Sequence, residues 1–81
     1  MKLTFAIPRW LMKIYLTELG ATEVEDDRLI AAGWQASIRQ GQPVKVGSLV
    51  VGRIEVEFSG DEAAIESILP RLYLKTFRAG G

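Results

Sequence analysis

The sequence predicts one α+β domain, in which a curved antiparallel sheet is covered on one side by two helices. Several short stretches alternate apolar and polar residues, which is the period of half-buried strands, and two longer stretches carry apolar residues at helical spacing. The order along the chain is strand, helix, four strands, helix. Because the 81 residues include no linker, internal repeat or low-complexity segment, we expect a single domain over residues 1–81.

The composition points away from enzymes and from polyanion binding. Ten basic and ten acidic residues give a formal net charge of zero, so nucleic acid is an unfavoured partner. Cysteine and histidine are absent, which excludes disulfides, thiol nucleophiles, most zinc sites and the commonest general acid–base residue. No apolar run approaches the ~18 residues of a membrane helix, and no signal peptide is recognisable. We therefore expect a non-enzymatic cytoplasmic protein without a cofactor, a metal or a membrane contact.

The first strand and the first helix are predicted at the start of the chain. Residues 3–7 alternate in polarity as a half-buried strand does. Pro8 ends this strand and serves as the first residue of a helix that runs to about Leu19, and Gly20 suits a left-handed C-cap. At 100° per residue, one side of this helix is a broad apolar face made of Leu11, Met12, Tyr15, Leu16 and Leu19.

Trp10 and Ile14 fall outside that apolar face, beyond a polar stripe. Two interpretations follow. In the first, both side chains pack under a neighbouring loop or the second helix. In the second, they form an exposed contact for a protein partner or for a second subunit of a homo-oligomer.

A hairpin and a long strand are predicted next. Residues 22–25 and 28–32 pair around a turn at Asp26-Asp27, because both runs favour strands and the acidic pair suits a tight turn. Residues 34–40 then alternate in polarity. Their predicted inner face carries Trp34, Ala36 and Ile38.

The stretch from residue 44 to residue 58 is the longest β signal of the sequence. Residues 44–46 suit a short separate strand before Gly47. Leu49 and Val51 have the opposite parity to Ile54, so we expect a change of register, typical of a β-bulge, near Gly52.

A second helix is predicted to begin at about Gly60, since Ser59 and Glu62 have the spacing of a capping box. Its buried stripe consists of Ala64, Ile65, Ile68 and Leu69. Pro70 predicts a kink or a restart, because proline removes one backbone donor. Residues 72–77 suit either a continued helix, with Leu72, Tyr73 and Phe77 on the same face, or a last strand.

Several residue groups are candidates for a site. The acidic run at residues 23–27 offers oxygen ligands, but a solvated hairpin turn explains it better than a metal does. Glu55 and Glu57 share one strand face, and Arg39 is the expected cross-strand partner of this pair. A weaker candidate is a small-ligand or nucleic-acid site on the concave sheet, which requires an open face lined by Trp34, Ile38 and Arg39.

The chain ends with Gly80-Gly81, preceded by Arg78 on a basic segment. Two residues without side chains can pass through a narrow active-site channel, so such an end suits a carboxylate that another protein activates. Arg78 could then help this segment dock on an acidic surface or beside an ATP site.

The stretches "TFAIPRWLMKIYLTELGATE", "PVKVGSL", "IEVEFSGDEA" and "RAGG" together resemble the small C-terminal domain attached to proteins related to the molybdopterin synthase small subunit (MoaD). The resemblance covers residues 4 to 81 and implies a TBP-like β-α-β4-α fold. Proteins related to that subunit are sulfur carriers of β-grasp fold whose C-terminal glycine is adenylated and converted to a thiocarboxylate. By this resemblance Gly81 would bear the reactive carboxylate. The predicted element order lacks the initial hairpin of a β-grasp domain, so the chain resembles the appended module alone.

We therefore expect an accessory module that contacts a sulfur-carrier or adenylating protein, in sulfur-carrier or molybdenum-cofactor chemistry. The candidate interaction residues are Trp10, Ile14 and Arg78. The alternative is that Gly80 and Gly81 form the loaded end of a carrier of sulfur or acyl groups.

Overall fold

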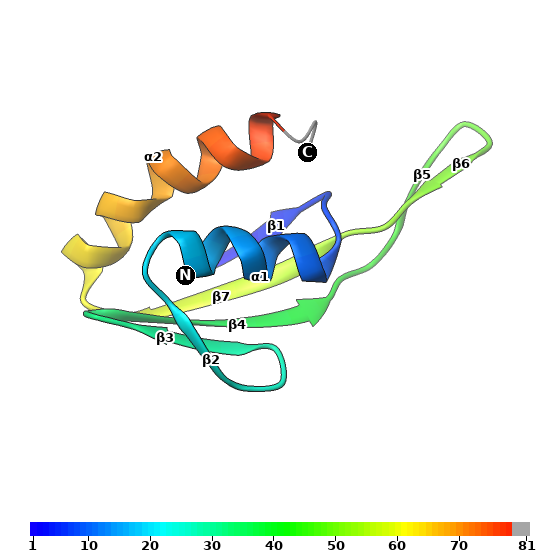
Figure 1. Cartoon of the computed structure of the whole chain (residues 1–81). Coiled ribbons are helices and arrows are strands. Elements are labelled where there is room, and N and C mark those ends of the chain that lie inside the picture. Colours follow the sequence, from blue (N-terminus) through cyan, green and yellow to red (C-terminus); the bar gives the residue numbers. More distant parts are fainter. Residues whose placement is uncertain (79–81) are drawn as a thin grey trace.

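A computed structural model describes residues 1–78 of the chain and shows two layers, a sheet and a pair of helices on one of its faces (Figure 1). The elements are β1 (Lys2–Phe5), α1 (Arg9–Glu18), β2 (Thr22–Glu25), β3 (Arg28–Ala31), β4 (Trp34–Gln40), β5 (Val44–Val46), β6 (Leu49–Val51), β7 (Ile54–Gly60) and α2 (Glu62–Arg78). No helix within this described part is long and apolar enough to span a bilayer.

The main sheet has five strands in the order β1-β7-β4-β3-β2, and all neighbours are antiparallel. Strands β5 and β6 leave it as a separate hairpin, so the main sheet contains one strand before α1 and four after it. This is the predicted β-α-β4-α order, and the predicted α+β class is confirmed. Strand β1 pairs antiparallel with β7, and within residues 1–78 it is the strand that leads into α1.

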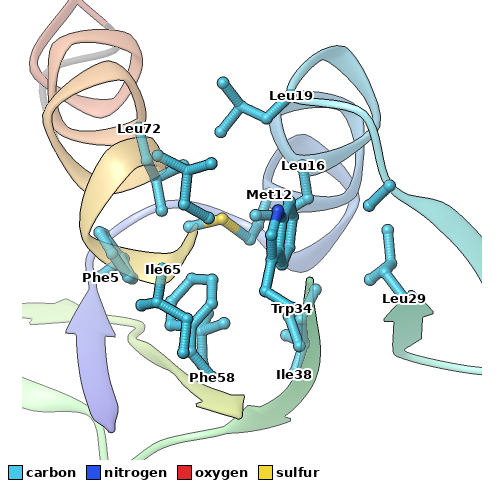
Figure 2. Packing of buried hydrophobic residues seen from close by; sticks show 14 of the residues in the cluster. Phe5, Met12, Leu16, Leu19, Leu29, Trp34, Ile38, Phe58, Ile65 and Leu72 are labelled. Carbon is cyan, nitrogen blue, oxygen red and sulfur yellow. The ribbon is translucent and has the colours of Figure 1, made fainter. Parts of the chain in front are cut away.

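The core lies between the sheet and the two helices (Figure 2). Strands β4 and β7 alternate buried and outward-facing residues, so each sends one apolar row toward the helices. Met12 and Leu16 of α1 and Ile65 and Leu72 of α2 close over these rows. The buried rows are Trp34, Ala36 and Ile38 from β4, and Ile54, Val56 and Phe58 from β7. The opposite face of β4 and β7 is polar and solvated.

Helix α1 begins and ends close to where the sequence predicts. Pro8 occupies the N-cap position, one residue before the predicted place, and its carbonyl accepts hydrogen bonds from the amides of Leu11 and Met12. Leu19 is the C-cap, and Gly20 follows with φ +109°, a conformation that favours glycine. The predicted left-handed residue at Gly20 is therefore confirmed.

Strands β5 and β6 form a hairpin, residues 44–51, that projects from the far end of β4 and β7 (Figure 1). We call it the arm. Gln40 pairs with Ile54 whereas Val44 pairs with Val51, so four steps on the first strand oppose three on the second. The register therefore changes near Gly52, as predicted. Residues 41–43 and 52–53 belong to no strand, however, so the change is a break between two sheets and the predicted β-bulge is wrong.

Helix α2 corrects one expectation and decides between two alternatives. Ser59 pairs with Gln35 inside β7, so the predicted capping box is wrong; the carbonyl of Asp61 instead accepts the first helical bond, from the amide of Ile65. The helix then runs without interruption through Pro70 to Arg78, so residues 72–77 are helical and not a strand.

Candidate interaction surface

The outer face of α1 carries two large exposed apolar side chains. Trp10 is 63% exposed and Ile14 is 47% exposed, so they do not pack under a loop or under α2. At 100° per residue, they lie about 150–170° from the mean direction of the buried residues of the helix. Both side chains therefore point away from the sheet. One turn separates them, and together they form a contiguous apolar surface, which we call the α1 surface.

Ion pairs on both sides of α1 hold the α1 surface in place. On the side of β2, Arg9 Nη1 lies 2.9 Å from Asp27 Oδ2, and Lys13 Nζ lies 3.0 Å from Asp27 Oδ1. On the side of α2, Lys75 Nζ lies 2.8 Å from Glu18 Oε1. The same ammonium lies 5.8 Å from the ring centroid of Tyr15. The helix is thus fixed in rotation, because polar contacts hold it on both sides and its buried stripe holds it below.

The acidic run at residues 23–27 is the electrostatic partner of α1. Glu23, Asp26 and Asp27 bring carboxylate oxygens within 4.8 Å of one another, a spacing that a cation could bridge. Lys13 Nζ is already among them, at 2.9 Å from Glu23 Oε2 and 3.6 Å from Asp26 Oδ1. The carboxylates are therefore neutralised by the helix, and the cluster is explained as a structural ion-pair network.

This network shifts two pKa values. The hydrogen bond from Lys13, with a second from the backbone amide of Asp27, lowers the pKa of Glu23 below its ordinary value. Reciprocally, the hydrogen bonds to Glu23 and then Asp27 raise the pKa of Lys13. The Glu23 contribution to stability is present above its unfolded pKa of 4.5 and is lost as the pH falls through its lower folded pKa. The Lys13 contribution is present below 10.5 and is lost only above that pH.

Replacing Lys13 with methionine is expected to lower the melting temperature by a few degrees at pH 7, because three carboxylates then lose their shared cation. The deficit relative to wild type should shrink as the pH falls through the range where Glu23 becomes protonated. Differential scanning calorimetry from pH 7 to pH 2.5 measures this difference. Arg71→Met is the control, because Arg71 is exposed on α2 and forms no ion pair within residues 1–78. A deficit that is constant with pH would contradict the assignment.

The last turns of α2 expose apolar side chains that were predicted to share one apolar face with Leu72. Leu72 is buried as expected, but Tyr73 and Leu74 are about half exposed and Phe77 is 82% exposed. Thr76, not Phe77, completes the buried stripe of this helix. Helical spacing could have identified Thr76. It lies four residues after Leu72 and so shares its face, whereas Phe77 lies five residues after Leu72 and does not. Arg78 is exposed at the end of this helix, whereas Gly80 and Gly81 lie outside the described residues.

The weak ligand site predicted on the concave sheet is wrong. Trp34 and Ile38 are buried under the two helices, where the ring of Trp34 lies 6.1 Å from that of Phe58. Arg39 points to the opposite, solvated face, because neighbouring residues of a strand alternate in direction. Its Nε lies 3.6 Å from Glu55 Oε1, and the two residues are directly paired across β4 and β7. The predicted cross-strand Arg39–Glu55 pair is confirmed.

The arm is a third exposed apolar region, and the sequence analysis does not single it out as a candidate surface. The pairing of Val44 with Val51 and of Val46 with Leu49 places these four aliphatic residues on one face, which we call the apolar face of the arm. Lys45 and Val50 form the opposite face. Leu49 is 67% exposed and Val46 is 58% exposed.

Comparisons with known proteins identify the family but add no characterised relative. No curated protein matches the chain significantly. A family model described as archaeal MoaD-like protein matches residues 2–81, which is almost the whole sequence. The predicted relation to proteins that resemble the molybdopterin synthase small subunit is confirmed by this match. The chain belongs to the archaeal MoaD-like protein family.

Proposed function

We propose that the chain is a non-enzymatic interaction module that binds a protein of a sulfur-carrier or molybdenum-cofactor system through the α1 surface. The observation that carries this proposal is the exposure of Trp10 and Ile14 directly opposite the buried stripe of α1. Nothing among the described residues covers them, and the fold does not need them, because the core is complete without either side chain.

The α1 surface has the properties of an energetic centre of an interface. Tryptophan is enriched among interface residues whose truncation costs 2 kcal/mol or more, since a large rigid side chain loses little entropy on binding. The ion pairs of Arg9 and Lys13 fix the helix, so the two apolar side chains are presented without reorganisation. A fitting partner offers an apolar groove that accepts Trp10 and Ile14 one helical turn apart.

The family relation favours adenylating and sulfur-carrier proteins as this partner, because the matched family is MoaD-like. A second role comes from the same match, which extends through Gly81. In that role the carboxylate of Gly81 attacks ATP and releases pyrophosphate, and sulfide then displaces AMP from the acyl-adenylate to leave a thiocarboxylate. The reacting groups would be the terminal carboxylate and an enzyme-bound nucleotide, so this chain would still supply no catalytic side chain.

One experiment tests both roles. The full chain is incubated with a candidate adenylating protein, ATP and sulfide, and the recovered complex and the intact mass are both measured. We expect Trp10→Ala/Ile14→Ala to reduce recovery of the partner at least ~10-fold, as the loss of one central hot spot does. The matched control is Thr17→Ala, an exposed residue on the same helix.

Two results would contradict the α1 surface. One is unchanged recovery with the folded double variant, and the other is an equal loss with Thr17→Ala. The carrier role predicts a gain of about 16 Da, the difference between sulfur and oxygen at an acyl group. Loading that persists after deletion of Gly80-Gly81 would exclude it.

A further inference from the structure

The arm exposes aliphatic side chains in one copy of the chain. Strands β5 and β6 pair only with each other among the described strands, and each has three residues. An isolated two-stranded hairpin is marginally stable in water, so an apolar hairpin usually requires packing against something else. Here the outer half of the apolar face is uncovered among residues 1–78, since Val46 and Leu49 are exposed, whereas Val44 at its base is partly buried.

A hollow lies at the base of the arm, where it leaves the main sheet. Its volume is about 430 Å³, and it is lined by residues 6–9 between β1 and α1, by residues 51–54 and by Gln40. Its walls combine apolar groups with the two arginines Arg9 and Arg53. Val51 belongs both to this hollow and to the apolar face of the arm, so the two surfaces are continuous.

We propose that the arm and this hollow form the interface between two copies of this chain, related by a two-fold axis. In such an arrangement the arms lie antiparallel with their apolar faces together, and the tip of each arm, at Gly47-Ser48, covers the hollow at the base of the other. An interface around a two-fold axis uses the same surface twice and must be complementary to itself. The chain has both halves of such a surface, because the tip of the arm projects from the body and the hollow lies beside the base of the same arm.

Charge favours a second copy over a charged partner. The apolar face of the arm contains no ionisable group, and Lys45 is on its other face, so two apolar faces can meet without opposing like charges. Residues 46–50 contain no charged side chain. The tip can therefore approach Arg9 and Arg53 of the other copy without repulsion and pack against their aliphatic stems.

The area that two arms alone would bury is too small for a specific interface, so the interface must include the hollow. A fully buried aliphatic side chain removes roughly 60–120 Å² from water, so four half-exposed ones contribute about 200 Å² per arm. Two arms alone would bury about 400 Å², well below the ~1,200 Å² of a small specific interface. Reciprocal insertion of the tips enlarges the contact at both ends. We accordingly expect a weak dimer, with a dissociation constant between about 10 µM and 1 mM.

Sedimentation velocity of the full chain from 5 µM to 1 mM tests the proposal. The wild type should shift from monomer to dimer across this range. Val46→Thr/Leu49→Thr should raise the dissociation constant at least ~10-fold, because it places hydroxyls on the apolar face while threonine still suits a strand. The matched control is Lys45→Thr/Val50→Thr, which changes the directly paired residues on the opposite face and should leave the dissociation constant within about 2-fold.

Cysteine crosslinking tests the geometry, since the natural chain has no cysteine. Under mild oxidation, Ala6→Cys/Ser48→Cys should form a disulfide-linked dimer, because the tip of one arm reaches the base of the other. Ser48→Cys alone should not crosslink. A monomer at 1 mM, an equal effect of the two double threonine variants, or tip-to-tip crosslinking would overturn the proposal. So would a monomeric chain that binds phospholipid vesicles through the arm. Trp10→Ala/Ile14→Ala should leave dimerisation unchanged, so this test is independent of the α1 surface.

Discussion

Replacing Phe58 with alanine is expected to lower the free energy of unfolding by about 3–5 kcal/mol, which is the usual cost of truncating a buried phenylalanine. Phe58 is 1% exposed and belongs to β7, which pairs with both β1 and β4. Its ring contacts the layer formed by Trp34 and α2 in the middle of the core (Figure 2). A cavity at this position cannot be filled from one side, because strands surround it and both helices close it.

The loss is large for this protein because the domain is small. A domain of 81 residues has a total stability of roughly 4–12 kcal/mol, so Phe58→Ala should remove about a quarter of it or more. Urea denaturation monitored by far-UV circular dichroism measures the change. Glu57→Ala is the matched control, because Glu57 is the preceding residue on the solvated face, and it should change stability by less than about 0.5 kcal/mol. A loss below about 1.5 kcal/mol for Phe58→Ala would contradict the central packing role.

The core was predictable where one periodicity applied along a whole element. Residues 34–39 and 54–58 alternate strictly, and both strands lie inside the sheet with helices on one face only. Their inner residues therefore could be named from parity alone. The same holds for the buried stripe of α1, where helical spacing selects Met12, Leu16 and Leu19.

The exposure of Trp10 and Ile14 could not be predicted from periodicity. Helix α1 has apolar residues on two sides, and the spacing does not say which side the rest of the chain covers. That depends on α2, which contacts α1 on the side of Tyr15 and Glu18, as the position of Lys75 shows. The site was thus predicted as one of two alternatives, and only the tertiary arrangement distinguishes them.

At two positions, long-range contacts outweigh the local sequence preference. Ser59 has the spacing of a helix cap, but seven successive pairs between β4 and β7 keep it in the strand. Pro70 removes one helical hydrogen bond, yet the helix continues because Ile68 and Leu72 on either side of it are buried against the core. The weak ligand site made of Trp34, Ile38 and Arg39 could have been rejected from the sequence. Even and odd positions of a strand point to opposite faces of the sheet, so Arg39 cannot line the same face as the other two residues.

The connection between β7 and α2 sets the direction in which α2 leaves the sheet, and Gly60 is the residue that permits it. Gly60 has φ +121°, a region that residues with a side chain rarely adopt. A Cβ at this position would lie 2.6 Å from the carbonyl oxygen of Gly33 and 2.9 Å from Cα of Trp34. The carbonyl of Gly33 also accepts the amide of Asp61 at 2.8 Å, which ties the start of α2 to β4.

Gly60→Ala is therefore expected to destabilise the domain by about 3–5 kcal/mol, because backbone strain and a clash with backbone atoms combine. Two other glycines separate these causes. Gly20→Ala has the strain without the clash, since φ is +109° and no atom lies within 4 Å, and should cost about 1 kcal/mol. Gly52→Ala has neither and should change stability by less than about 0.5 kcal/mol. Urea denaturation of all three variants in a Trp10→Phe background, with Trp34 fluorescence as the probe, measures the order. If Gly60→Ala cost no more than Gly20→Ala, the close contact between β7 and Gly33 would not constrain the start of α2, and the direction of that helix would have to be set by its buried stripe alone.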